Sequence, residues 1–323
     1  MKAIVQDNYG SVDALRLDEI DPPVVGDRDV LIRVRAAGVD PGVWHLMAGL
    51  PYLTRVMGFG LRRPKNRVRG VDVAGTVDAV GAAVTRFVVG DEVMGTCEGS
   101  FAELAVTAED RLVTKPASIT FEQAAAAPIS GITALEAVVD KGRVQADQRV
   151  LVIGAGGGTG SFAVQIAVAS GARVTGLCGP DKADLVRSLG AETVVDYTTT
   201  DLADLPERFD LIIDTAGRRS LRALRGVLTR SGTIVIVGGE GGGRWLAGFD
   251  RGFRGAILAL FLRQRIVPLV ASESLTGLER LRVLIEGGAV TPVVGRTYPL
   301  ADAGEAITHL HDGHAAGKIV VTT

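Results

Sequence analysis

The sequence predicts an α/β fold in which a doubly wound parallel sheet is inserted into a β-rich domain. Short apolar runs in residues 1–119 alternate with turns that contain Gly, Pro and Asp, as is typical of antiparallel strands. In residues 120–272, continuous apolar runs alternate with helical segments, which is the pattern of a parallel sheet covered on both faces. Residues 273–323 return to mixed helix and short strands. We therefore expect residues 1–119 and 273–323 to form one domain, interrupted in sequence by a second domain at 120–272.

The elements follow from hydrophobic periodicity. In the first domain, strands are expected where apolar and polar residues alternate, at residues 2–6, 30–39, 73–81 and 101–108. An alanine-rich helix is expected over residues 121–142, interrupted at Pro128 and Gly131. In the second domain, six apolar runs are strand candidates, at residues 150–155, 173–178, 193–197, 210–217, 233–239 and 265–272. Helices are expected between the first three of these strands, at residues 159–171 and 181–190.

Composition and charge limit the classes of protein to which the chain can belong. Hydrophobic residues make up 47% of its 323 residues and charged residues 22%, enough for the cores of about two domains. The net charge of -2 gives no electrostatic basis for binding nucleic acid. The cysteines, Cys97 and Cys178, exclude a disulfide scaffold and a four-cysteine zinc site. The first residues do not form a signal peptide, and Arg263 and Arg265 interrupt the longest apolar stretch, so we expect a cytoplasmic protein without a membrane partner.

A glycine-rich segment, Gly154–Gly160, joins the first strand candidate of the second domain to a helix. Small residues let the backbone turn tightly and approach a phosphate, and the helix N-terminus adds N–H groups and positive potential. The position between a strand and a helix makes the match to a dinucleotide-binding pattern specific. We expect Gly157, Gly158, Thr159 and Gly160 to bind the pyrophosphate of a dinucleotide, and a purely structural turn is the alternative.

The end of the second strand candidate decides which dinucleotide is preferred. An NAD site usually has Asp or Glu there to bind the ribose 2′-hydroxyl, whereas this strand ends at Cys178-Gly179-Pro180. Lys182 follows in the loop, and its ammonium group suits a 2′-phosphate, which predicts NADPH as the cofactor, with Gly179 also in contact. Asp181 argues the other way, because a carboxylate suits the ribose and repels the phosphate. The alternative for Lys182 is a solvated residue in the first turn of the next helix.

Segments along nearly the whole chain carry a resemblance to a known family. They are KAIVQDNYG, VLIRVRAAGVDP, GVDVAGTVDAVG, GDEVMGT, FAELAV, AAAAPISGITALEAV, the glycine-rich segment, SLGAETVVDY and TYPLADAGEAITHLHDGHAAGKIVV. In this order and spacing they resemble the medium-chain dehydrogenase/reductase superfamily, in particular its zinc-free quinone-reductase-like branch. The resemblance implies a GroES-like barrel domain that bears the substrate cleft and a Rossmann domain that binds NADPH. It also implies a homodimer formed through the edge strand of the Rossmann sheet, expected at residues 265–272.

The resemblance also implies roles for residues near the reacting groups. Thr133 corresponds to a threonine that approaches the nicotinamide, and Asp40 falls where quinone reductases have an asparagine near the nicotinamide and the substrate. His45 falls where they often have a tyrosine, and an imidazole there can hydrogen-bond a carbonyl oxygen or supply a proton. Tyr52 is a second candidate donor. Packing roles are the alternatives for His45 and Tyr52.

On the cofactor side, the resemblance implies contacts at the ends of three further strands. Tyr197 matches a tyrosine beside the adenosine, and Ala216 and Gly217 follow the fourth strand, near the adenine ribose. Gly238 and Gly239 end the fifth strand, near the nicotinamide. All of them lie beyond the carboxyl ends of strands, where open α/β sheets bind their ligands. Strand-end packing or an ordinary turn is the alternative at each position.

No zinc site is expected. The zinc alcohol dehydrogenases of the superfamily have a cysteine early in the barrel, a Gly-His-Glu segment and a further ligand, whereas this chain has Asp40 and Gly70-Val71-Asp72 in the first two places. A catalytic zinc needs three converging protein ligands. His309, His311 and His314 lie near the end of a helix, where histidines suit the negative end of the dipole, and we expect them to be solvated. A metal site formed by these histidines is the alternative.

One run of like charges stands out in the chain. Arg62, Arg63, Lys65, Arg67 and Arg69 lie close together in the segment GFGLRRPKNRVRG. We expect this segment to be a solvated loop. The alternative is a cover over the substrate cleft that favours acidic substrates.

These observations lead to one expected activity. Without a metal Lewis acid, the reduction of a conjugated carbonyl or a quinone asks less of a protein than the oxidation of a simple alcohol. The sequence therefore predicts an NADPH-dependent, zinc-independent oxidoreductase that transfers a hydride to a small-molecule quinone or α,β-unsaturated carbonyl. The alternatives are an NADP-binding regulatory module with little turnover and an NADP-dependent alcohol dehydrogenase.

Overall fold

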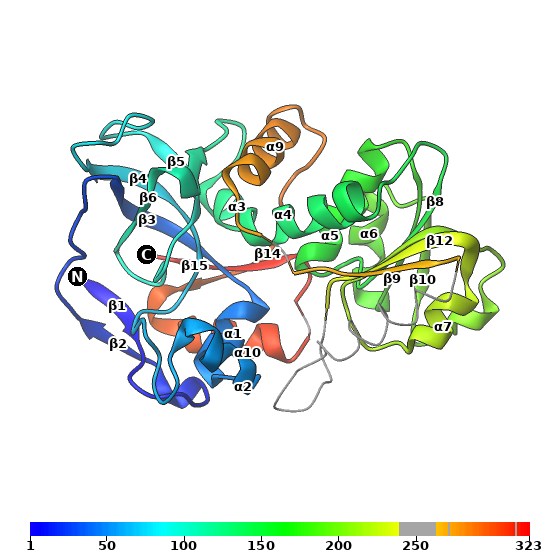
Figure 1. Ribbon diagram of the computed structural model, residues 1–323, viewed down its shortest axis with the longest axis horizontal. Helices are drawn as coiled ribbons and strands as arrows, with labels where there is room; N and C mark the ends of the chain where they lie inside the picture. The colour runs from blue at the N-terminus through cyan, green and yellow to red at the C-terminus, as the bar shows by residue number, and fades with distance from the viewer. Residues whose placement is uncertain (239–262, 271, 314) are drawn as a thin grey trace. The chain divides into compact units, whose positions relative to one another are not determined.

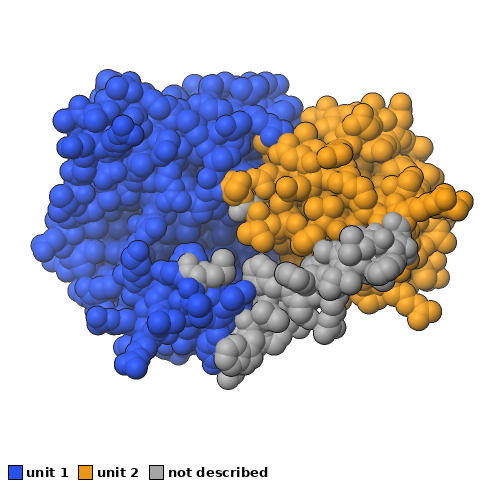
Figure 2. Space-filling view, viewed as in Figure 1, with its two compact units in different colours: residues 1–132, 273–323 blue, residues 133–272 orange. Residues whose placement is uncertain are grey.

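The structure, a computed structural model, describes residues 1–238, 263–270, 272–313 and 315–323. The chain divides into unit 1, with residues 1–132 and 273–323, and unit 2, with residues 133–272 (Figure 2). The sequence of unit 2 thus interrupts that of unit 1. The first division falls within helix α4 (Pro128–Leu135), later in the chain than the boundary after residue 119 that we expect from the sequence.

In the described residues, unit 2 is built on a six-stranded sheet in which all neighbouring strands run parallel. Its strands are β8 (Arg149–Ile153), β9 (Arg173–Cys178), β10 (Thr193–Asp196), β11 (Phe209–Asp214), β12 (Leu228–Ile236) and β13 (Arg265–Pro268). Their order is β10-β9-β8-β11-β12-β13, so the chain leaves β8 toward one edge and β11 toward the other. This order confirms the predicted doubly wound sheet and sets its switch point at the carboxyl ends of β8 and β11.

Three helices of unit 2 follow strands of this sheet. They are α5 (Gly158–Ala169), α6 (Ala183–Ser188) and α7 (Leu221–Gly226). The residues of α5 from Gly160 to Ala167 are all buried, because this helix is small or apolar on nearly every side. Leu151, Ile212 and Ile234, from three neighbouring strands, belong to one buried apolar cluster. The start of α5 is therefore held firmly beside the switch point of the sheet.

In its described part, unit 1 contains a seven-stranded sheet and a two-stranded one, β1 (Lys2–Val5) with β2 (Arg16–Glu19). The strands of the larger sheet are β3 (Asp29–Val39), β4 (Asp72–Val80), β5 (Glu92–Thr96), β6 (Leu104–Ala108), β7 (Leu112–Thr114), β14 (Val294–Pro299) and β15 (Lys318–Thr322). Their order is β14-β15-β3-β4-β5-β7, with β6 paired to β3. The last strand of the chain, β15, thus lies directly beside β3 (Figure 1).

The helices of unit 1 differ from the sequence-based expectation at Gly131, where no helix interruption occurs. They are α1 (Pro41–Ala48), α2 (Tyr52–Thr54), α3 (Phe121–Ala125), the first part of α4, α9 (Leu275–Glu286) and α10 (Ala303–His311). The expected interruption at Pro128 is present, because proline lacks the N–H that would continue α3. The one expected at Gly131 is wrong, since Gly131 lies inside α4. A Cβ there would be 2.5 Å from Cδ2 of Leu281, so this glycine allows close packing against α9.

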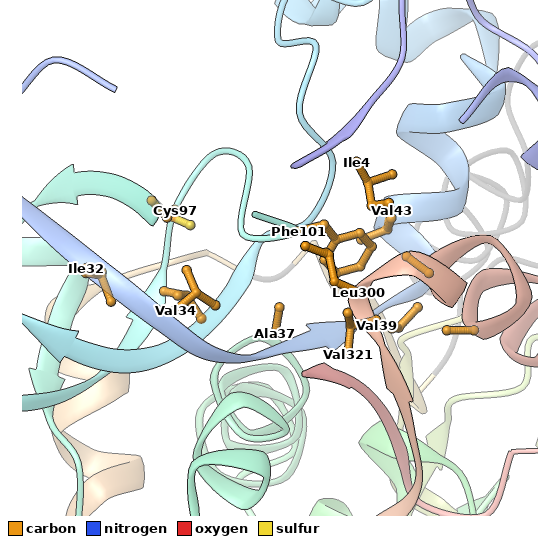
Figure 3. Close-up of a cluster of buried hydrophobic side chains, with 14 of the residues drawn as sticks. Ile4, Ile32, Val34, Ala37, Val39, Val43, Cys97, Phe101, Leu300 and Val321 are labelled. Atoms are coloured by element: carbon orange, nitrogen blue, oxygen red, sulfur yellow. The ribbon is translucent and has the colours of Figure 1, made fainter. Parts of the chain in front are cut away.

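An apolar core lies between the larger sheet and the helices of unit 1. The ring of Phe101 is fully buried, beside Ile4, Val43 and Leu300 (Figure 3). Val39, at the end of β3, belongs to the same cluster. This packing fixes the carboxyl end of β3, from which α1 begins.

Candidate functional site

The segment Gly154–Gly160 joins the end of β8 to the start of α5, as the sequence predicts. Gly154 has a φ of 81°, a left-handed conformation that residues with a side chain rarely adopt. A Cβ on Gly160 would lie 2.0 Å from the carbonyl oxygen of Gly154, so only glycine fits where the helix meets the strand end. Gly157 is the N-cap of α5, and residues 158–160 form the first turn. The N–H groups in the first turn of α5 point out of the helix, toward any anion bound there.

Side chains from the ends of β9 and β10 lie beside this segment. A Cβ on Gly156 would be 2.7 Å from the Cβ of Lys182, so the stem of Lys182 runs along the glycine-rich segment. At the end of β9, a Cβ on Gly179 would be 3.6 Å from the hydroxyl oxygen of Tyr197 and 2.8 Å from Oδ1 of Asp181. The predicted partner of a 2′-phosphate and its predicted competitor therefore both lie at the same strand end.

The turn after β11 approaches the glycine-rich segment from the other side of β8. A Cβ on Gly154 would be 3.6 Å from the Cβ of Ala216. The N–H of Gly217 donates to Oδ1 of Asp214 at 3.0 Å, and Asp214 is fully buried. A buried carboxylate at the end of β11 thus holds the turn 215–217 in place.

The chain after β12 passes along the same edge, since a Cβ on Gly238 would be 2.1 Å from the carbonyl oxygen of Thr215. Gly239 lies outside the described residues. The predicted cofactor residues that the structure brings to this edge are Gly157, Gly158, Thr159, Gly160, Gly179, Lys182, Tyr197, Ala216, Gly217 and Gly238. Small residues around a helix N-terminus, with one cation beside them, fit the phosphates and riboses of a dinucleotide.

A cluster of charged side chains is buried in unit 1, where β15, β3 and β4 meet. The ammonium of Lys318 forms an ion pair with Oδ1 of Asp40 and lies 3.4 Å from Oδ2 of Asp72. The hydroxyl of Ser130 donates to Oδ1 of Asp40 at 3.3 Å, and the N–H of Ile129 donates to Oδ1 of Asp72 at 3.0 Å. The side chains of Lys318, Asp40 and Asp72 are only 2%, 5% and 0% exposed. All three charged groups are therefore removed from water.

The strand register explains why these groups meet. β15 pairs antiparallel with β3, and their register, continued by one residue, sets Lys318 opposite Asp40. On the other side of β3, Gly38 lies opposite Asp72 in β4. A Cβ on Gly38 would be 2.9 Å from Oδ2 of Asp72, so the missing side chain makes room for this carboxyl group.

Burial and neighbouring charges decide the protonation of the cluster. Burial, together with the charge of Asp40, raises the pKa of Asp72 well above its usual value. Burial also acts to raise the pKa of Asp40, but the ammonium of Lys318 and the hydrogen bonds that Asp40 accepts outweigh it and lower this pKa. Burial acts to lower the pKa of Lys318, and the two carboxyl groups outweigh it, so that this pKa is raised. The cluster is thus an ammonium, a carboxylate and a protonated carboxyl group, which avoids burying a net charge.

One carboxylate oxygen of Asp40 accepts from none of the groups named above. Oδ2 of Asp40 is buried, and no backbone or side-chain N–H or O–H of the described residues reaches it. A protonated Asp72 supplies a donor to Asp40, and this hydrogen bond contributes to the low pKa of Asp40. Asp40, a predicted catalytic residue, therefore uses its hydrogen-bonding capacity within unit 1.

His45 and Tyr52, the predicted donors of the substrate cleft, lie in α1 and at the start of α2, and both are half-buried. Nδ1 of His45 is 2.8 Å from the carbonyl oxygen of Leu50, so Nδ1 carries the proton and Nε2 is the acceptor of the neutral ring. The guanidinium of Arg55 packs on two aromatic rings, 4.9 Å from the centre of Tyr52 and 4.3 Å from that of Tyr9. Both predicted donors therefore also have packing roles.

Thr133, the predicted nicotinamide contact, lies on α4 and is 8% exposed. It follows Ser130 by one helical turn, so the two side chains lie on the same face of the helix. Because Ser130 donates to Asp40, the helix that carries Thr133 is tied to the buried cluster one turn earlier.

The histidines near the end of α10 each have an aromatic contact. Nδ1 of His309 is 2.9 Å from the hydroxyl oxygen of Tyr298, and the ring of His311 stacks on Trp44 with centroids 4.3 Å apart. His311 is exposed, whereas His309 is half-buried, so the expectation of solvated histidines holds for His311 alone. His314 lies outside the described residues.

The described residues do not fit a zinc site. No group of three His, Cys, Asp or Glu side chains among them is placed to hold a metal ion. Asp40 and Asp72 fall where the zinc alcohol dehydrogenases of the superfamily have a cysteine and the last residue of their Gly-His-Glu segment, but the cation between them is Lys318. This ammonium would repel a divalent ion, and a third ligand is missing from the described part of the chain.

The sequence predicts a role for Asp40, but not its contacts with Lys318 and Asp72. Lys318 and Asp72 stand in apolar strand segments, KIVV and VDVAG, where a charged residue is uncommon unless it is paired. That pattern is the signal that could have found them. The pairing itself requires the sheet register, because the three residues are far apart in the sequence.

Comparison with known proteins agrees with this geometry. The family model described as an alcohol dehydrogenase GroES-like domain matches residues 26–117. The family model described as a zinc-binding dehydrogenase matches residues 189–321. The chain is 33% identical to an NADPH-dependent alkenal/one oxidoreductase of Arabidopsis thaliana, over 99% of its own length and 79% of that protein. It is 30% identical to a quinone oxidoreductase of Sus scrofa, over 99% of its own length and 97% of that protein.

The solved structures lead to the same superfamily. A crystal structure described as an NAD-dependent alcohol dehydrogenase matches with a TM-score of 0.86 at 28% identity, covering 100% of both chains. The parallel strand order of unit 2, its glycine-rich segment at the switch point and two relatives aligned over 99% of the chain support one assignment. The chain belongs to the medium-chain dehydrogenase/reductase superfamily, among its quinone oxidoreductases.

Proposed function

We propose that the protein is an NADPH-dependent oxidoreductase that transfers a hydride to a small-molecule quinone or α,β-unsaturated carbonyl. The observation that carries this proposal is the glycine-rich edge of unit 2 with the stem of Lys182 running along it. The relatives named as an NADPH-dependent alkenal/one oxidoreductase and a quinone oxidoreductase support the cofactor and the substrate class.

The residues of unit 2 would hold the cofactor by its phosphates and riboses. The first-turn N–H groups of α5 suit the pyrophosphate, and the ammonium of Lys182 suits the 2′-phosphate. Gly179 and Tyr197 would flank the adenosine, Ala216 and Gly217 the adenine ribose, and Gly238 the nicotinamide. NADPH supplies the hydride when bound, so the tasks of the chain are to orient the substrate and to supply a proton.

We assign the role of proton donor to the substrate to a residue of unit 1. Hydride transfer to a quinone or enone leaves charge on an oxygen, which a hydrogen-bond donor stabilises and then protonates. In its neutral form, His45 presents Nε2 as an acceptor because Nδ1 donates to Leu50, whereas the hydroxyl of Tyr52 is a donor as it stands. We therefore assign the donor role to Tyr52, and to His45 when its ring carries a second proton.

Asp40 is assigned a positioning role. Its side chain is 5% exposed, and its oxygens interact with Lys318, Ser130 and a proton on Asp72. Through Ser130 it ties the buried cluster to the start of α4, the helix that carries Thr133. Asp40 would thus orient Thr133, the candidate nicotinamide contact one turn further along α4.

We propose that the reaction proceeds without zinc, because Lys318 supplies the cation between Asp40 and Asp72. Metal analysis of the purified protein is expected to find much less than one zinc per chain. NADPH oxidation is expected to be the same before and after dialysis against a chelator. Activity that is lost on chelation and restored by zinc would contradict this part of the proposal.

Assays with a panel of quinones and enones test the activity itself. NADPH oxidation that depends on one of these acceptors is the expected result. Tight binding of NADPH without turnover of any acceptor would favour a regulatory module instead. Reduction of NADP⁺ that depends on a simple alcohol would favour an alcohol dehydrogenase.

We also propose a homodimer, joined through β13, and a location in the cytoplasm. In the described residues β13 is an edge strand, and Val270, which follows it, is 71% exposed. No helix of the described residues is long and apolar enough to cross a membrane. Cys97 and Cys178 are buried thiols, which a reducing compartment preserves. Cell fractionation tests the location.

A further inference from the structure

A segment of unit 1 carries cations without any carboxylate. Residues 41–70 contain six Lys or Arg side chains and no Asp or Glu, in a chain whose net charge is -2. The overall charge therefore hides a strongly basic local segment. Its cations differ in what they contact, and the structure separates them into two groups.

Three of the six cations are bound within the fold. Arg55 donates to the carbonyl oxygen of Gly49 at 2.8 Å and packs on two tyrosine rings. Arg67 forms an ion pair with Asp7 at 2.6 Å, and Arg69 is buried. The other three, Arg62, Arg63 and Lys65, are exposed and form no ion pair with a described residue.

These three cations lie on a loop whose base is anchored. The N–H of Lys65 donates to the carbonyl oxygen of Phe59 at 2.9 Å and closes the loop. The hydroxyl of Tyr9 donates to the carbonyl oxygens of Phe59, at 2.9 Å, and Gly60, at 2.6 Å. Leu61, Arg62 and Arg63 follow at the tip. The loop is therefore a built projection with a fixed base.

Apolar side chains are exposed beside the same cations. Val56 is 73% exposed, Leu61 69% and Phe59 47%. Leu61 lies at the tip of the loop, and Val56 and Phe59 belong to the helical turn Arg55–Phe59 that leads into it. Large apolar side chains that remain in water gain free energy when a partner removes them from water. Exposed cations alone would suit any polyanion, but apolar side chains among them favour a partner with an apolar interior behind an anionic surface.

We propose that residues 56–65, here called the basic loop, dock the protein on the surface of a membrane that contains anionic phospholipid. Leu61, Phe59 and Val56 would enter the boundary between headgroups and acyl chains, while Arg62, Arg63 and Lys65 contact the phosphates. The interaction is peripheral and reversible. It does not depend on the proposed oxidoreductase activity, because the loop and its partner involve neither NADPH nor substrate.

Sedimentation of the full chain with vesicles tests the inference, without cofactor or substrate. The protein is expected to sediment with vesicles of phosphatidylcholine and phosphatidylglycerol, much less with phosphatidylcholine alone, and less as the salt concentration rises. The double variant Arg62→Gln, Arg63→Gln is expected to lower the partition constant about 25-fold, since each cation near an anionic surface contributes about fivefold. Leu61→Ser is expected to lower it about tenfold or more.

A matched control tests whether exposed apolar side chains act alone. Val88 and Val89 are 65% and 63% exposed in unit 1, far in sequence from the basic loop. The double variant Val88→Ser, Val89→Ser is expected to bind vesicles like the original protein. All variants alter exposed side chains, so their thermal unfolding checks that the fold is kept.

Three outcomes would overturn the inference. The first is the absence of sedimentation with anionic vesicles. The second is a double variant, Arg62→Gln, Arg63→Gln, that binds as well as the original protein. The third is binding to anionic vesicles that Leu61→Ser leaves unchanged and that a soluble polyanion such as heparin matches, because a surface for nucleic acid or an acidic protein would then explain the charges.

Discussion

Lys318 pairs with one of two buried carboxyl groups that lie far from it in the sequence, and burial together with the charge of Asp40 raises the pKa of the other, Asp72. An ammonium and two carboxylates removed from water would leave a net negative charge, unless one carboxyl group keeps its proton. Asp40 is paired directly with Lys318, whereas Asp72 lies 3.4 Å away and keeps the proton. A single buried side chain thus takes the place that a metal ion would need.

Replacement of Asp72 tests this protonation state. A raised pKa in the folded protein means that the contribution of Asp72 to stability is complete below its unfolded pKa of about 3.9 and is lost as the pH rises through the folded pKa. Asp72→Asn keeps an acceptor for Ile129 and a donor for Asp40 at every pH. We expect the free energy of unfolding of the original protein, relative to Asp72→Asn, to fall by up to about 1.4 kcal/mol per pH unit between these two pKa values.

Urea unfolding of both proteins at a series of pH values measures this difference. Asp78→Asn, on the same strand, serves as the control, because Asp78 forms only an exposed ion pair with Arg33 at 2.7 Å. A difference between the original protein and Asp72→Asn that is the same at every pH would contradict a protonated Asp72.

Lys182 and Asp181 compete at the end of β9. A cation hydrogen-bonded to the 2′-phosphate favours NADPH, but partial exposure of Lys182 weakens the contact. We expect Lys182→Ala to raise the KM for NADPH about tenfold and to change that for NADH little. Asp181→Ala is expected to lower the KM for NADPH relative to that for NADH, because it removes a negative charge beside the phosphate.

Steady-state kinetics with both cofactors check these two variants. Lys141→Ala changes an exposed lysine elsewhere in unit 2 and is expected to leave both KM values unchanged. If Lys182→Ala raises the KM for NADPH and the KM for NADH by the same factor, Lys182 does not contact the 2′-phosphate.

At the scale of elements, β3 organises the buried cluster. It pairs with β15 on one side and β4 on the other, and its carboxyl end leads into α1. Gly38 provides the space in which the carboxyl group of Asp72 approaches the ion pair. The sequence predicts β3 and β4 from alternation, but only the pairing of both with their neighbours shows that three charged residues lie together.

Gly38→Ala tests this close approach. The new Cβ would lie 2.5 Å from the carbonyl oxygen of Ala125, so the backbone must shift and the cluster must separate. We expect a loss of about 3 kcal/mol in the free energy of unfolding. Gly42→Ala, in α1, is the matched control, because nothing lies within 4 Å of its Cβ, and it is expected to stabilise the protein by about 0.5 kcal/mol. Equal effects of the two substitutions in denaturant unfolding would contradict the packing argument.

At the scale of the whole molecule, we expect the protein to associate through β13, which is an edge strand among the described residues. An unpaired edge next to an exposed apolar side chain invites pairing with a second copy. We expect sedimentation velocity to show a dimer of the original protein and a monomer of Val270→Asp with unchanged thermal unfolding. Val24→Asp, at a side chain that is 89% exposed in unit 1, is expected to remain a dimer. If the original protein is a monomer, or if the Val270→Asp variant is still a dimer, β13 is not the dimer interface.

The sequence by itself determined the features that are local along the chain. The glycine-rich segment between a strand and a helix, the six apolar strand candidates and Lys182 after the second strand are all readable there, because each depends on neighbouring residues or on hydrophobic periodicity. The tertiary structure alone decided the partners of Asp40 and which cations of the basic segment are bound within the fold, Arg67 by Asp7 and Arg69 by burial. Sheet register and burial bring together residues that are distant in sequence, and the pKa of a carboxyl group depends on those neighbours.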